Sequence, residues 1–144
     1  MKFRKAKKKD ISEMFEILKS NNPKYSKKLA LRELKEMFSN SLIKPKYIVA
    51  EDNGKIVAFN GYSYSWTDNL ITNLFWLNVH PNYMRKGIGS KLVIYLISHI
   101  KKEKLGVKMI ILSTKIPSFF KRFGFKIIER KYDKNYNLMA KRIN

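Results

Sequence analysis

The chain has 144 residues, 44% of them hydrophobic and 13% aromatic, so we expect one folded domain spanning residues 1–144 rather than a disordered chain. It has no cysteine and only two histidines, which excludes disulfides and thiolate nucleophiles, predicts no metal site and fits a cytoplasmic protein. Its 31 Lys and Arg against 11 Asp and Glu give a net charge of +20, which attracts anionic partners.

The first part of the chain predicts a short strand and two helices. The strand is expected over residues 2–6. The charged start of the chain leads into Asp10 instead of an apolar stretch, so we expect no export signal, and the apolar stretches are too short for a membrane anchor. Asp10, with Glu13 three residues later, predicts a capping box for the first helix. Residues 21–23 predict the end of that helix, and Ser26 predicts the cap of a second one.

Three strands follow in the middle of the chain. Residues 47–50 and 56–66 read as a hairpin around the Asp-Asn-Gly turn at 52–54. A second turn at 67–69 leads into a strand over 70–79, which a proline ends.

The last part predicts a long apolar helix over residues 87–104, a buried strand over 108–112 and a short helix over 118–121. Strands over 125–130 and 136–141 then form a closing hairpin, whose last strand would be an edge and leaves a homodimer open. The resulting order, β-α-α-β-β-β-α-β-α-β-β, predicts an α/β (α+β mixed) fold. Its single mixed, mostly antiparallel sheet of about seven strands would carry helices on both faces.

The most specific signal is the loop between the strand ending at residue 79 and the long helix. Glycines at 87 and 89 remove side chains where the first helical amides have no partners, and Arg85 and Lys86 precede them. Helix dipole, free amides and cations together favour a pyrophosphate. We expect this group to be bound by Met84, Arg85, Lys86, Gly87, Ile88, Gly89 and Ser90.

Two further motifs carry a family resemblance. Leu77-Asn78-Val79-His80-Pro81 precedes the glycine loop, and Phe119-Phe120-Lys121-Arg122-Phe123-Gly124-Phe125 follows in the last third of the chain. With these motifs in this element order, the chain resembles the GNAT superfamily of acyl-CoA-dependent N-acetyltransferases over essentially its whole length.

The resemblance implies an enzyme that transfers acetyl from acetyl-CoA, its co-substrate, to a primary amine by direct attack in a ternary complex. In this family two neighbouring strands splay apart and the pantetheine arm lies between them. Here it would pair with the backbone of Leu77 and Val79, where an exposed amide would also act as the oxyanion donor. Asn78, Phe119 and Phe120 complete the expected CoA-binding set.

The catalytic groups stay open. Phe120 stands where the family often has a tyrosine that protonates the leaving thiolate, and phenylalanine has no hydroxyl to donate. The central strand also lacks an acidic residue that could act as general base. The candidates that remain are Asn78, which could orient a water, and the hydroxyls of Tyr83 and Ser118.

On the acceptor side, Tyr62, Tyr64, Trp66 and Trp76 lie on neighbouring predicted strands and could form the substrate pocket, although an apolar sheet face under a helix would explain them equally. The positive field favours a small amine, an amino acid or an acidic peptide end. Two alternatives remain open. One is an acyl-CoA-binding module without catalysis, and the other is a basic nucleic-acid-binding protein, which would leave the glycine loop unexplained.

Overall fold

Seven strands form one open sheet in the order β1-β2-β3-β4-β5-β7-β6 in the computed structural model, which describes residues 1–66, 68–103 and 106–143. The strands are β1 (Lys2–Lys5), β2 (Lys46–Asp52), β3 (Lys55–Tyr64), β4 (Ile71–Val79), β5 (Met109–Thr114), β6 (Lys126–Asp133) and β7 (Tyr136–Arg142). The helices are α1 (Ile11–Asn21), α2 (Lys27–Lys35), α3 (Ile88–Lys102) and α4 (Pro117–Lys121), with short 3-10 turns η1 (Lys8–Asp10), η2 (Glu36–Phe38) and η3 (Pro81–Tyr83). The predicted fold class and element order are confirmed; the predicted turn residue Thr67 and helix end Lys104 lie outside the described residues.

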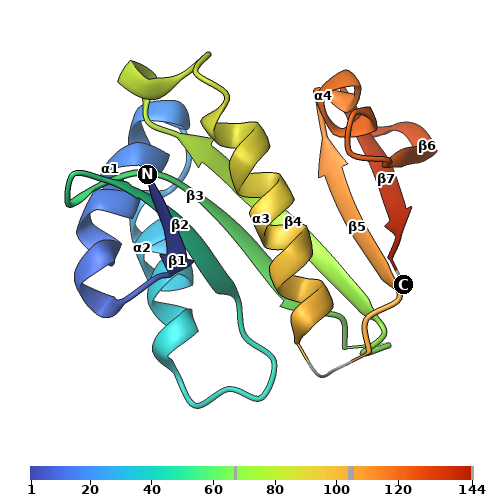
Figure 1. Cartoon of the computed structure of the whole chain (residues 1–144), viewed down its shortest axis with the longest axis horizontal. Coiled ribbons are helices and arrows are strands. Elements are labelled where there is room, and N and C mark those ends of the chain that lie inside the picture. The colour runs from blue at the N-terminus through green and yellow to red at the C-terminus, as the bar shows by residue number, and fades with distance from the viewer. Residues whose placement is uncertain (67, 104–105, 144) are drawn as a thin grey trace.

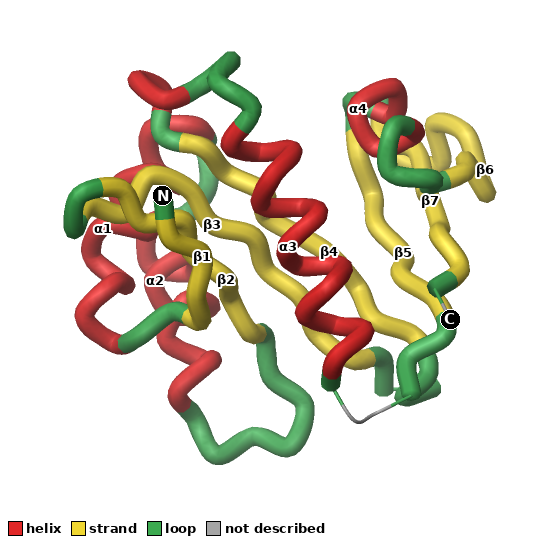
Figure 2. Tube along the Cα trace, in the orientation of Figure 1, coloured by secondary structure: helices red, strands yellow, loops and turns green. Residues whose placement is uncertain are grey.

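Helices cover both faces of the sheet (Figure 2). On one face, α1 and α2 bury Met14 and Leu34 against the β2 and β3 side chains Tyr47 and Phe59. On the other face, α3 buries an apolar stripe against the sheet, together with Phe120 of α4. This stripe of Ile88, Leu92, Val93, Leu96, Ile97 and Ile100 has the helical spacing that the sequence predicts.

The start of α1 differs from its prediction. Asp10 makes no side-chain cap on α1; instead, Arg4 Nη1 and Nη2 donate to its two carboxylate oxygens at 2.6 and 3.0 Å, and the Lys7 amide donates at 2.7 Å. Glu13 accepts from the Ile56 amide at 2.9 Å, so the predicted capping box is wrong because both carboxylates have tertiary partners. Burial alone would raise the pKa of Asp10, but the hydrogen bonds from Arg4 and Lys7 outweigh it and hold that pKa below its usual value. The cap of α2 is as predicted, since Ser26 Oγ accepts from the Leu29 amide.

The C-terminal strand is not an edge strand. Strand β7 pairs antiparallel with both β5 and β6, so β6 lies at the edge of the sheet. The residues of β6 are almost all exposed, whereas those of β7 are buried or partly buried except for the last one. The predicted hairpin forms, but it docks through its second strand, so the edge at this end of the sheet is the charged β6, and β1 is the edge at the other end.

Strands β4 and β5 separate along their length (Figure 1). They pair in parallel only between residues 71–73 and 109–111, and the rest of β5 pairs with β7 alone. A β-bulge lies where they part: Trp76 and Leu77 together stand opposite Asn60, and Trp76 has a left-handed φ of 52°. Asn60 Nδ2 donates to the Phe75 carbonyl at 2.9 Å, which gives that oxygen a partner at the bulge. The sheet is therefore open beside β4.

Candidate active site

Two cavities meet at this opening. The loop cavity, about 700 Å³, is lined by Asn21, Asn22, Leu77, Asn78, Val79, Tyr83, Met84, Arg85, Gly87, Ile88, Gly89, Ser90, Ile116, Phe119 and Arg122. The strand cavity, about 580 Å³, is lined by Asn21, Asn22, Asn60, Leu74, Phe75, Trp76, Leu77, Asn78, Leu112, Ser113, Thr114, Lys115, Ile116, Phe120 and Tyr136. They share Asn21, Asn22, Leu77, Asn78 and Ile116, which form a junction between one cavity and the other.

The loop cavity has the anion-binding features that the sequence predicts. Gly87 is the N-cap of α3 in left-handed conformation (φ 78°), and its carbonyl accepts the first helical hydrogen bond, from Lys91, at 3.1 Å. The amides of Ile88, Gly89 and Ser90 precede that bond, so they are the unpaired donors at the positive end of the helix dipole. Arg85 is also left-handed, with φ 63°, a conformation that is uncommon outside glycine.

Gly89 gives the cavity its depth beside the helix start. A Cβ on this residue would lie 3.6 Å from Val79 Cγ2 and 3.8 Å from Phe119 Cζ. Val79 and Phe119 both line the loop cavity, so a side chain at 89 would take up space beside them. The absence of one leaves the helix amides open to a ligand.

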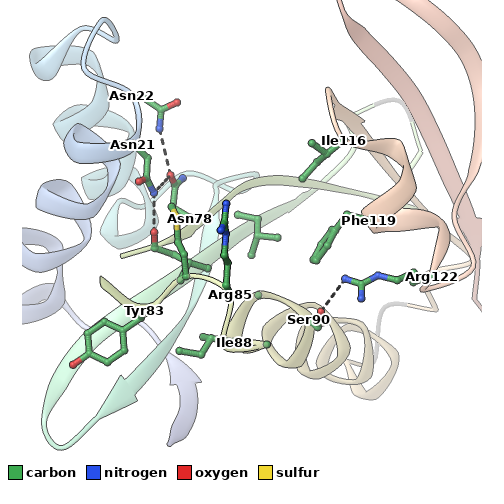
Figure 3. Close-up of a pocket in the computed structure, with 15 residues that line it drawn as sticks. Asn21, Asn22, Asn78, Tyr83, Arg85, Ile88, Ser90, Ile116, Phe119 and Arg122 are labelled. Atoms are coloured by element: carbon green, nitrogen blue, oxygen red, sulfur yellow. Dashed lines mark hydrogen bonds between the residues drawn. The ribbon is translucent and has the colours of Figure 1, made fainter. Parts of the chain in front are cut away.

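Arg122 is a cation that the sequence analysis did not single out for the site. Its guanidinium lies 4.9 Å from the ring centroid of Phe119, and its Nη2 donates to Ser90 Oγ at 3.2 Å. Figure 3 shows Arg122 reaching from α4 to the start of α3, with Arg85 entering the same cavity from the loop. The sequence could have indicated Arg122, because it lies one helical turn after Phe119, which was predicted to bind CoA.

An asparagine network fixes the junction (Figure 3). Asn21 Nδ2 donates to the Val79 carbonyl at 3.0 Å and to Asn78 Oδ1 at 3.1 Å, and Asn22 Nδ2 donates to the Leu18 carbonyl and to Asn78 Oδ1. Because both neighbours present NH2 groups, the Asn78 atom facing them must be its oxygen. The NH2 of the buried Asn78 is therefore left as a donor at the junction of the two cavities.

The strand cavity has an apolar and amide-rich wall. Trp76 and Phe120 supply aromatic surface, and Lys115 extends with its Nζ 5.0 Å from the ring centroid of Tyr136. None of the lining residues within the described part of the chain is an Asp or Glu. A carboxylate general base is thus missing from this wall, as the sequence of the central strand indicates.

The four predicted acceptor aromatics do not come together. Only Trp76 lines the strand cavity. Tyr62 and Tyr64 turn toward α3, where both hydroxyls donate to the Glu103 carboxylate, and Trp66 is 79% exposed beyond the end of β3. Burial and these hydrogen bonds raise the pKa of both tyrosine hydroxyls, which brace the end of α3 against the sheet.

The other predicted residues divide between the two cavities. All the expected CoA-binding residues line the loop cavity except Lys86, whose ammonium lies over the Tyr83 ring, and Phe120, which is buried in the strand cavity wall. Of the catalytic candidates, Asn78 lies at the junction. Tyr83 lines the loop cavity but directs its hydroxyl away from the space between the strands (Figure 3), and Ser118 is exposed and lines neither cavity.

Two wider observations concern metals and membranes. Across residues 1–66, 68–103 and 106–143, no three His, Cys, Asp or Glu side chains gather as potential metal ligands. None of the helices in those ranges combines the length and apolar character needed to cross a membrane.

Comparisons with known proteins agree with this fold. Residues 44–127, more than half of the chain, match the family model described as "Acetyltransferase (GNAT) domain", whereas no curated protein sequence matches. An aminoglycoside 6'-N-acetyltransferase complexed with coenzyme A is similar in structure, with a TM-score of 0.81 and 18% identity over 100% of this chain and 98% of that one. The Enterococcus faecium aminoglycoside 6'-N-acetyltransferase gives 0.80 and 17% over the same shares of each chain. The PaiA N-acetyltransferase from Thermoplasma acidophilum, in complex with coenzyme A, gives 0.74 and 21% over 99% and 98%.

Proposed function

The chain belongs to the GNAT family of acetyltransferases, and on that premise we propose that it transfers an acetyl group from acetyl-CoA to a primary amine by direct attack. The observation that carries the proposal is the junction at Asn78, where the cavity at the start of α3 adjoins a second cavity between splayed strands. A donor and an acceptor bound in the two cavities would meet there. This arrangement suits a ternary complex, and without cysteine no thiol acyl-enzyme can form.

Acetyl-CoA fits the chemistry of the loop cavity. The amides of Ile88, Gly89 and Ser90 would bind its pyrophosphate, because they are unpaired and lie at the positive helix end. Arg85 and Arg122 border the same cavity and add charge-assisted contacts to phosphate oxygens. The pantetheine arm would then follow β4 past Val79 and Leu77 to the junction.

At the junction we assign Asn78 the role of donor to the thioester carbonyl. Its oxygen is taken by Asn21 and Asn22, so only its NH2 can face the ligand. The Val79 carbonyl is taken as well, by Asn21. A donor held in place before reaction stabilises the negative charge that develops on the carbonyl oxygen.

The reaction needs little proton chemistry from the protein. The amine nitrogen forms a bond to the thioester carbon, the C–S bond breaks, and the thiolate gains a proton while the amine loses one. Since the strand cavity wall has no carboxylate within the described ranges and Phe120 has no hydroxyl, we assign both proton transfers to water. An amine already neutral in solution would be the reactive form.

Calorimetric titration with acetyl-CoA, followed by free-thiol release with a panel of primary amines, tests the proposal. We expect saturable binding and amine-dependent release, with intersecting initial-rate lines when both substrates vary. Binding without release for any amine would favour a non-catalytic acyl-CoA-binding module instead. Parallel initial-rate lines would contradict direct transfer.

The role of Asn78 has its own test. The change Asn78→Asp keeps an oxygen for Asn21 and Asn22 but removes the NH2, so we expect about a hundredfold lower kcat; because the new carboxylate is buried, the melting temperature is measured alongside to separate lost stability from lost catalysis. Asn40→Ala, at an exposed position outside both cavities, serves as the control. A kcat for Asn78→Asp within a few-fold of the parent, or above it, would remove Asn78 from the mechanism.

A further inference from the structure

The charge of the strand cavity is one-sided. Its wall holds one cation, Lys115, and no Asp or Glu among the residues described. Lys115 makes no ion pair with any residue that the structure describes, and its ammonium lies over the Tyr136 ring instead. Lys115 is exposed, but a cation on a cavity wall without a counter-ion there still attracts an anionic group, and the net charge of +20 adds to that attraction.

Lys115 is also close to the point of reaction. It directly precedes Ile116, which lines both cavities at the junction, and it follows the end of β5. Lys115 lines the same cavity as the junction residues, so an acceptor whose amine lies at the junction could reach Lys115 with an anionic group through that cavity.

A cationic acceptor lacks the corresponding partners. A second ammonium group on the acceptor would approach Lys115 and, across the junction, Arg85, with no carboxylate on the strand cavity wall to bind it. Like charges at close range oppose binding. The amide-rich and aromatic remainder of the wall, including Asn60 and Trp76, is neutral and tolerates a short aliphatic chain.

We propose that the acceptor of this enzyme is a primary amine that carries a carboxylate a few bonds away, and that Lys115 is the residue that selects it. The proposal rests on the acetyl transfer proposed above and names its substrate class: amino acids or the amino ends of short acidic peptides. Lys115 acts by binding the carboxylate and takes no part in the chemical step.

The test compares acceptors that differ only in the charge of their far end. One set is 4-aminobutanoate, butylamine and 1,4-diaminobutane; the other is three tripeptide amides that begin with Glu, Gln or Lys. We expect the anionic member of the set that turns over to have at least tenfold higher kcat/KM than the neutral one, and the cationic member to be slowest. The parent protein is compared with Lys115→Gln, Lys115→Glu and the control Lys55→Gln, an exposed hairpin position with the same loss of charge.

The variants distinguish the effect of the Lys115 charge from that of the net charge of the protein. Lys115→Gln should remove most of the anionic preference, mainly through KM, Lys115→Glu should reverse the ranking, and Lys55→Gln should leave it unchanged. A cationic acceptor that is fastest with the parent protein, or a ranking that survives Lys115→Glu, would overturn the proposal. If none of the acceptors in either set caused thiol release, the acetyl transfer itself would be refuted, and the acceptor class with it.

Discussion

Replacing Gly89 with alanine should separate the stability of the fold from its affinity for CoA. Gly89 is the second residue of α3 and does not have a positive φ, so alanine fits its backbone. The new methyl carbon would lie 3.6 Å from Val79 and 3.8 Å from Phe119, which is ordinary contact without overlap. Alanine is favoured over glycine in helices, so we expect the free energy of unfolding to rise by about 0.5 kcal/mol.

The same methyl group should weaken CoA binding. It would project from the start of α3, beside the free amides of Ile88, Gly89 and Ser90, toward Val79 and Phe119, which also line the loop cavity. A hydrogen bond to a charged group contributes about 1.5–3 kcal/mol, so losing one lowers affinity roughly 10- to 150-fold. Calorimetric titration with CoA measures the affinity, and urea denaturation measures the stability.

Gly54→Ala provides the matched control. Gly54 has φ +79° in the hairpin turn between β2 and β3, and a Cβ added there would have no atom within 4 Å, so alanine should cost about 1–2 kcal/mol of stability through backbone strain alone. CoA affinity should not change. If Gly89→Ala bound CoA as tightly as the parent protein, the pyrophosphate would not lie on the α3 amides and the donor site would be misplaced.

Three further predictions concern the fold and the pH dependence. Gly61→Ala would bring a Cβ within 2.5 Å of the Phe75 ring and 2.9 Å of Tyr47, so the free energy of unfolding should fall by about 1–3 kcal/mol in urea denaturation; an unchanged value would contradict this packing. Arg4→Met should cost about 3 kcal/mol at pH 7, because it leaves the buried Asp10 carboxylate without its ion-pair partner. The pKa of Asp10 is lowered in the fold, so the stability that its ion pair contributes is complete above the unfolded value near 4 and is lost at lower pH. The difference in free energy of unfolding between Arg4→Met and the parent protein should therefore shrink toward pH 2, and a difference that grew would have the wrong sign. For catalysis with 4-aminobutanoate, kcat/KM should rise about tenfold per pH unit with the neutral fraction of the amine, toward its pKa near 10, and with a peptide α-amine only toward about 8; with 4-aminobutanoate a plateau near pH 7 would reveal a general base on the protein.

Local sequence was sufficient for the glycine loop. Gly87 takes the left-handed conformation at the start of α3, and the apolar spacing of that helix sets its buried face. Both features depend on residues within a few positions of each other, so spacing and residue type determine them. The hairpin at Asn53 and Gly54, both with positive φ, was predictable for the same reason.

The edge of the sheet was misjudged because chain order does not say which strand of a hairpin docks. The residue composition of the two strands distinguishes the edge strand from the interior one. Strand β6 carries Glu129, Arg130 and Lys131 in sequence, whereas β7 has Leu138, Met139 and Ala140, which suit an interior strand. Weighing composition above chain position would have placed β6 at the edge.

The junction was only partly predictable, because it depends on contacts between distant segments. Asn21 and Asn22 read as the end of a helix, and they are, yet their amides bind Asn78, which lies more than fifty positions later. The bulge at Trp76 has no sequence mark of its own, since a glycine usually takes that conformation. Asp10 and Glu13 fit a local capping pattern, but Arg4 and the Ile56 amide bind them more favourably.

In the proposed reaction, the acetyl group passes directly from CoA to an amine at the junction of the two cavities. Its most direct test is to incubate the protein with acetyl-CoA and 4-aminobutanoate or the Glu tripeptide amide, and to quantify free CoA thiol and acetylated amine together. Direct transfer predicts that the two products appear in equal amounts and only when both substrates are present. Thiol release without acetylated amine would mean hydrolysis instead of transfer, and would contradict it.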